Sequence, residues 1–120
     1  MSIKELLATY RDLAAPATKE VTVEYEGVTH TFRTRLIGFR DANAINLSLL
    51  GADGKVDVSK VQPYREKLLA GSIAPDDGDP DYTVDDVGRW PVALAELLEK
   101  AVRKANGQVE LAGEAAAKNS

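Results

Sequence analysis

The chain contains no cysteine, one histidine, one tryptophan and no long apolar run. The lack of cysteine excludes disulfides, thiolate metal sites and a cysteine nucleophile. No apolar stretch approaches the roughly 20 residues that span a membrane as a helix. Basic residues are outnumbered 15 to 19 by acidic ones, which gives a net charge of −4 and no excess of positive charge for phosphate binding. We therefore expect a soluble protein of a reducing cytoplasm that contacts neither nucleic acid nor a membrane.

The length of 120 residues fits one domain, and 44% hydrophobic residues suffice for an ordinary core. We predict an α+β fold with an N-terminal helix, a β-hairpin, and a bundle of three to four helices packed on one face of the hairpin. The domain spans residues 1–107. Residues 108–120 are polar and alanine-rich without a core-facing pattern, so we expect a flexible C-terminal tail.

The best-defined helix is predicted over about the last sixteen residues of the stretch from Asp81 to Gly107. Pro91 fits its first helical position, and Asn106 with Gly107 is a typical stop signal. Just upstream, Thr83 and Asp86 have the spacing of a capping box. The apolar stripe consists of Leu94, Leu97, Leu98, Ala101, Val102 and Ala105. Two i,i+4 ion pairs are expected on the solvent side, Glu96 with Lys100 and Glu99 with Arg103.

A first helix is predicted to begin after Ser2, whose spacing from Glu5 fits a capping box, and to end before Pro16. We favour a helix that packs on the core over a membrane-surface or partner-binding helix. Its apolar positions are Ile3, Leu6, Leu7, Tyr10 and Leu13.

Strict alternation over residues 19–35 predicts a hairpin with a two-residue turn at Glu26 and Gly27. Because glutamate disfavours a positive φ, a bulged turn remains the alternative. A lone hairpin is marginally stable, so it needs helices against it or a third strand. The tight turn sets Tyr25 opposite Val28, Val23 opposite His30, Thr22 opposite Thr31, Val21 opposite Phe32 and Glu20 opposite Arg33.

Two further helices are expected, at residues 41–50 and from about residue 61 to a stop at Gly71. Ser59 has capping spacing to Gln62, yet Pro63 would then lie inside the helix. Either the helix starts at Pro63 or its first turn is irregular. Residues 73–80 are predicted to form a loop, because they are dense in Asp, Gly and Pro.

Candidate chemistry is sparse. The acidic loop at residues 76–81 fails the calcium-loop pattern, because a start at Asp77 places Tyr82 sixth and Gly88 twelfth, where glycine and glutamate are needed. His30 has no accompanying nucleophile motif, so we favour a packed or edge histidine. We therefore predict no catalytic residue, no metal site and no cofactor. Arg33, Arg35 and Arg40 are assigned to charge on the hairpin face.

Trp90 is placed between two helical segments. We favour a wedge between core elements, with an interface anchor as the functional alternative, because tryptophan is enriched at binding hot spots.

Residue chemistry alone does not indicate a function, and only a resemblance to a known family goes further. The run from Leu68 to Gly107 resembles the tail assembly chaperones of long-tailed, siphovirus-type bacteriophages. The shared features are a helix ending in an apolar patch (68–73), a Thr-x-acid-Asp step (83–87), a proline restart (89–91) and a last helix closing at Asn-Gly. The N-terminal helix and the hairpin are also similar, so the resemblance covers most of residues 1–107. The acidic insertion at residues 76–81 is longer than the usual loop of the family.

The resemblance implies a non-enzymatic protein that binds the tape-measure protein, keeps it soluble and helps recruit tail-tube subunits. Such chaperones leave before the tail is finished, which implies the host cytoplasm and not the mature virion. Self-association and a longer frameshifted product are compatible with it. The alternative is a structural virion component, such as a minor tail or head–tail connector protein. Apolar character suggests five partner-binding residues, Trp90, Leu69, Ile73, Val109 and Leu111.

Overall fold

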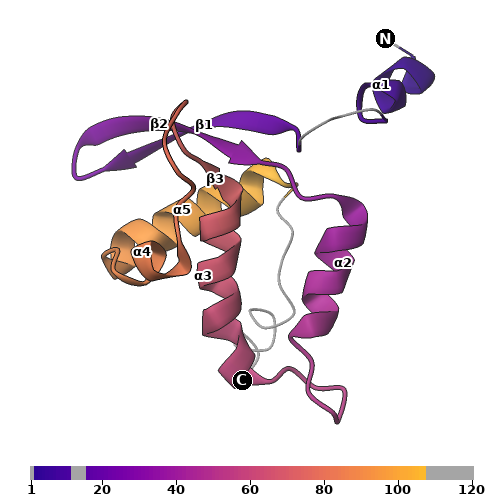
Figure 1. Cartoon of the computed structure of the whole chain (residues 1–120), viewed down its shortest axis with the longest axis vertical. Coiled ribbons are helices and arrows are strands. Elements are labelled where there is room, and N and C mark those ends of the chain that lie inside the picture. Colours follow the sequence, from indigo (N-terminus) through magenta and orange to yellow (C-terminus); the bar gives the residue numbers. More distant parts are fainter. Residues whose placement is uncertain (1, 12–15, 108–120) are drawn as a thin grey trace.

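The computed structural model describes residues 2–11 and 16–107, which form a mixed structure of helices and a small sheet (Figure 1). The predicted α+β fold is confirmed, since an N-terminal helix and a hairpin precede several helices. The proposed tail at residues 108–120 lies outside the described residues. The elements are α1 (Ile3–Thr9), β1 (Thr18–Tyr25), β2 (Val28–Arg35), α2 (Phe39–Ser48), the 3-10 turn η1 (Val58–Lys60), α3 (Val61–Ser72), β3 (Ile73–Ala74), α4 (Val84–Gly88) and α5 (Val92–Ala105).

The hairpin has the predicted register, with Val23 opposite His30 and the Thr22 and Thr31 hydroxyl oxygens 3.3 Å apart. Its turn is the tight one, because Glu26 has φ 52° and Gly27 has φ 78°. Positive φ at both central residues is what a type I′ turn requires. Glutamate therefore adopts a left-handed conformation that costs an L-residue roughly 1–2 kcal/mol.

The hairpin gains a third strand, which was one of the two expected means of stabilising it, but at residues that were not expected to form a strand. Residues 73–80 were expected to be a loop, but Ile73 and Ala74 pair with Thr34 and Arg33 as the antiparallel strand β3. Thr34 is fully buried, so its backbone needs an internal partner on that side. The pairing supplies one and completes a sheet in the order β1-β2-β3.

The core lies between the sheet, α3, α4 and α5. In Figure 1, α5 runs beneath the hairpin and α3 leads up into β3. Val102 of α5 is fully buried, at the centre of the predicted apolar stripe. The buried cluster is Leu69, Ala70, Ile73, Val87 and Val102, with Phe32, Trp90, Ala95 and Leu98 packed against it.

Helix α2 begins two residues earlier than expected and packs beside α3. Ala42 and Ile45 meet Tyr64 of α3 around an apolar cavity of about 20 Å³. The backbone N–H of Ile37 donates to the Asn106 side-chain oxygen at 2.6 Å, which ties the entry to α2 to the end of α5.

The core-packing role favoured for the first helix is wrong. Helix α1 ends at Thr9 and has no buried residue, although Ser2 caps it by accepting from the Glu5 N–H. It lies apart from the rest of the described chain (Figure 1). The sheet has other helices against it, because α5 contacts β1 and α3 contacts β2 and β3. Its apolar side chains are exposed, Ile3 at 69%, Leu7 at 61%, Tyr10 at 53% and Leu6 at 42%.

Several helix boundaries differ from expectation for local reasons. Pro63 lies in the first turn of α3, which the 3-10 turn η1 directly precedes. Asp57, and not Ser59, caps η1 by accepting from the Ser59 N–H. Gly71 does not end α3, because the chain passes directly from Ser72 into β3. Pro91 is the N-cap of α5, with ψ 143°, and not its first helical residue. The capping box of Thr83 and Asp86 is confirmed.

The strained turn gives a stability prediction. Glu26→Asn should raise the free energy of unfolding by about 0.5–1 kcal/mol, because asparagine tolerates positive φ and Asn-Gly is the favoured type I′ pair. Urea unfolding followed by circular dichroism measures the change. Glu24→Asn, in an extended strand position, is the control and should not stabilise. Equal effects at both positions would contradict the assignment of strain to Glu26.

The tyrosine beside α2 gives a pH prediction. Burial raises the pKa of Tyr64 to about 12, from 10.0. The folded state therefore holds the phenolic proton more tightly than the unfolded chain does. The contribution of Tyr64 to the free energy of unfolding is fully present below pH 10 and is lost as the pH rises through 12. Urea midpoints at about pH 9 and pH 11.5 should fall more in the parent protein than in Tyr64→Phe. The same fall in both proteins would refute the link.

Candidate binding groove

An open, mainly apolar groove of about 380 Å³ lies between the hairpin and α5. Alternation along β1 and β2 directs Val23 and its cross-strand partner His30 to the side of the sheet that faces α5. Leu94 and Leu98 meet them from α5, where the i,i+4 spacing keeps both on one face. The lining residues are Val23, Tyr25, His30, Phe32, Ile73, Tyr82, Trp90, Leu94 and Leu98.

Trp90 stands at the junction of α4 and α5 and lines this groove. Its ring meets that of Tyr82 edge to face, with centroids 5.7 Å apart and an interplanar angle of 78°. The wedge predicted for Trp90 fits its packing against the buried cluster, and its half-buried side chain also remains reachable from the groove. The two roles weighed for it are therefore compatible in this geometry.

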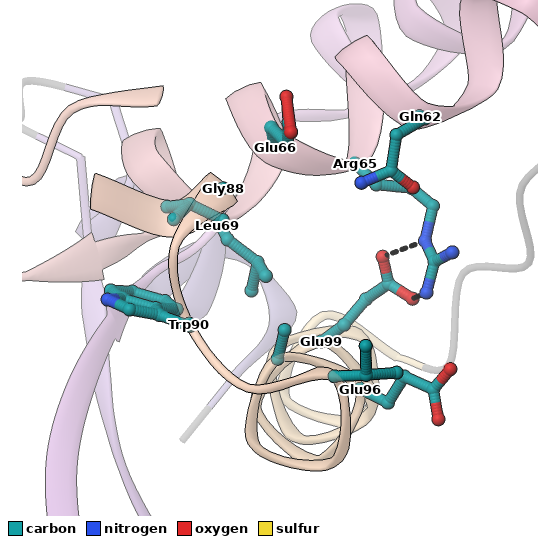
Figure 2. Close-up of a pocket in the computed structure, with 11 residues that line it drawn as sticks. Gln62, Arg65, Glu66, Leu69, Gly88, Trp90, Glu96 and Glu99 are labelled. Carbon is teal, nitrogen blue, oxygen red and sulfur yellow. Dashed lines mark hydrogen bonds and ion pairs between the residues drawn. The ribbon is translucent and has the colours of Figure 1, made fainter. Parts of the chain in front are cut away.

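A second pocket, of about 160 Å³, lies on the other side of Trp90, between α3 and α5. Figure 2 shows Trp90 at one end and Arg65 with Glu99 at the other. Arg65 donates to both carboxylate oxygens of Glu99, at 2.8 and 3.0 Å. Arg103 lies 2.7 Å from the same carboxylate, so one glutamate joins α3 to the last turns of α5.

This ion-pair network corrects the expectation for α5. The pair of Glu99 with Arg103 forms, but Glu99 is only 4% exposed and does not lie on the solvent side. Glu99 follows Ala95 by one turn and precedes Val102 by three residues, which places it on the buried face. That spacing could have revealed its burial. The partner on α3 could not be found from spacing within one helix.

The predicted contact residues fall into different environments. Trp90 lines both pockets. Leu69 and Ile73 are 2% and 5% exposed, so both belong to the core, with Leu69 at the wall of the second pocket and Ile73 at the wall of the groove. Val109 and Leu111 lie outside the described residues. A role of any of these five in binding stays a prediction.

The groove offers little for catalysis. His30 is exposed, and the described residues that line the groove with it include no serine, carboxylate or lysine. No cluster of three or more potential metal ligands occurs in residues 2–11 and 16–107. The acidic loop instead contacts the hairpin, because Asp81 pairs with Arg35 at 2.8 Å and Asp77 approaches Arg33 at 3.8 Å.

Comparisons with known proteins leave the family open. No protein-family model, no curated protein and no solved structure matches the chain. The resemblance to tail assembly chaperones therefore stays a prediction. Within the described ranges, no helix has both the length and the apolar character to cross a bilayer.

The ion-pair network generates a stability prediction. Glu99→Gln should lower the free energy of unfolding by about 3 kcal/mol, because the substitution removes a buried negative charge that contacts the guanidinium groups of Arg65 and Arg103. Glu96→Gln, on the exposed side of the same helix, should change it by less than about 0.5 kcal/mol. Chemical denaturation of both variants tests this, and similar small losses would show that the buried carboxylate contributes no more than a surface charge.

Proposed function

We propose that this chain is a tail assembly chaperone of long-tailed bacteriophages, which binds the tape-measure protein reversibly and helps recruit tail-tube subunits without catalysing a reaction. The motif resemblance over residues 68–107 motivates the proposal. The observation that carries it is the open groove of about 380 Å³, lined by aromatic and aliphatic side chains and free of catalytic groupings among the described residues.

The chemistry of the groove suits a polypeptide client. An amphipathic helix binds by laying its apolar face into such a groove, with anchors at i, i+3, i+4 and i+7. Tyr82 and Trp90 are large, rigid side chains at one end of it, and residues of this kind dominate binding energies. The groove is open, so an occupant can leave again, as a chaperone requires. The net charge of −4 favours solubility of a complex with an apolar client.

Binding of a tape-measure fragment tests the proposal. The full chain should bind the fragment in isothermal titration calorimetry, and Trp90→Ala should weaken binding by about 2 kcal/mol, or roughly thirtyfold in Kd. Because Trp90 also packs on the core, Tyr82→Ala provides a second variant at a more exposed position and should weaken binding as well. Val58→Ala, 80% exposed on η1, is the matched control and should bind like the parent protein.

Two results would count against the proposal. If neither this chain nor a frameshifted, extended form bound the fragment, the tape-measure protein would be excluded as its partner. Mass spectrometry of purified particles separates the chaperone from the structural alternative, because a chaperone should be missing from them. Detection at stoichiometric levels would assign the chain to the virion as a minor tail or connector protein.

A further inference from the structure

Within residues 2–11 and 16–107, no strand lies beside β1 on the side that faces away from β2. The sheet order is β1-β2-β3, so β1 is an edge strand of eight residues. Helix α5 lies beneath the hairpin in Figure 1, and no backbone hydrogen bond joins it to β1. A bare edge of this length is a template for another chain unless side chains prevent it.

The hydrogen-bonding groups on this edge can be identified from the register. The Leu36 N–H donates to the Ala17 carbonyl at 2.7 Å, so bonded pairs with β2 fall at the odd-numbered residues of β1. The backbone N–H and C=O groups of the even-numbered residues therefore point away from β2. No backbone hydrogen bond joins them to any other described residue. These residues are Thr18, Glu20, Thr22 and Glu24, and all four are exposed.

Two of the four carry negative charge that the fold leaves uncompensated. Glu20 and Glu24 form no ion pair with another described residue. The predicted partner of Glu20 is Arg33, which does lie opposite it, but its guanidinium approaches Asp77 instead. The edge therefore combines free backbone groups with two carboxylates spaced four residues apart.

These charges decide against a second copy of the chain as the occupant. Antiparallel pairing of two β1 strands centred on Thr22 would set Glu20 opposite Glu24 twice, and pairing centred on Glu20 would set that residue opposite itself. Pairing centred on Val21 would place Lys19 against Val23 and gather four carboxylates on one face. Each of these three registers brings carboxylates together, whereas a basic strand would gain attraction at the same positions.

We propose that β1 accepts an extended segment of another polypeptide as a fourth strand. The segment carries Lys or Arg opposite Glu20 and Glu24 and apolar residues opposite Val21 and Val23, in the pattern basic–apolar–any–apolar–basic. The apolar positions face the side of the sheet on which Val23 lines the groove. The proposal requires only this pattern in the partner, so it stands apart from the tape-measure assignment.

The test uses the full chain and the blocked heptapeptide Thr-Lys-Val-Thr-Val-Lys-Thr. When this peptide is titrated into 15N-labelled protein, the amides of Glu20, Thr22 and Glu24 should shift, and their hydrogen exchange should slow by roughly tenfold or more. N-methylation of the central Thr of the peptide should abolish binding, because that N–H would donate to β1. N-methylation of the first Val, whose N–H points away from β1, is the matched control and should leave binding intact.

Charge exchange tests the side-chain part of the proposal. The double variant Glu20→Lys/Glu24→Lys should bind the peptide roughly tenfold more weakly and should instead bind the version with Glu in place of both Lys. Glu5→Lys/Glu96→Lys changes the net charge equally away from β1 and should bind like the parent protein.

Three results would overturn the proposal. The first is that the lysine peptide does not bind. The second is that both N-methylated peptides lose affinity equally. The third is that the β1 amide signals shift with protein concentration when no peptide is present. The last would assign the edge to a second copy.

Discussion

The burial of the apolar face of α5 is the constraint on which the rest of the described structure depends. Val102 is fully buried, and the stripe around it needs cover on two sides. The hairpin covers one side, and α3 with α4 covers the other, which fixes the positions of β2, β3 and Trp90 in turn. Because burying a single large aliphatic side chain contributes about 1.5–3 kcal/mol, this packing outweighs any one surface ion pair.

Glu99 adds orientation to this packing. Apolar contacts between two helices tolerate small rotations and shifts, whereas a carboxylate that receives two hydrogen bonds from Arg65 and contacts Arg103 has one favourable position. A buried ion pair contributes little net stability compared with apolar residues of similar size. Removing only one of its two charged side chains is nevertheless costly, because the other charge stays buried. The network therefore fixes the relation of α3 to α5. Leu94 and Leu98, which line the groove, lie on the helix that this network orients.

Local patterns determined how much could be predicted from the sequence. Alternation fixed the hairpin register, including the Thr22–Thr31 pair, because side-chain direction in a strand has a strict period of two. The capping box of Thr83 and the stripe of α5 were likewise visible within a few residues. The third strand was not, because Ile73 and Ala74 become a strand only through pairing with β2. The exposure of α1 and the pairing of Glu99 with Arg65 also depend on distant parts of the chain, which periodicity within one helix does not report.

The two surfaces described on the hairpin share one strand. The odd-numbered residues of β1 direct side chains such as Val23 into the groove, and the even-numbered residues direct backbone groups outward at the edge. An occupant of the edge would extend the sheet beyond β1 and add its own apolar side chains to the side on which the groove lies. It would thereby lengthen the apolar surface available to a helix lying in the groove. A strand bound at the edge of β1 is therefore expected to favour binding of a helix in the groove, and the reverse. Each bound segment would cover apolar surface that stays exposed when the other segment binds alone.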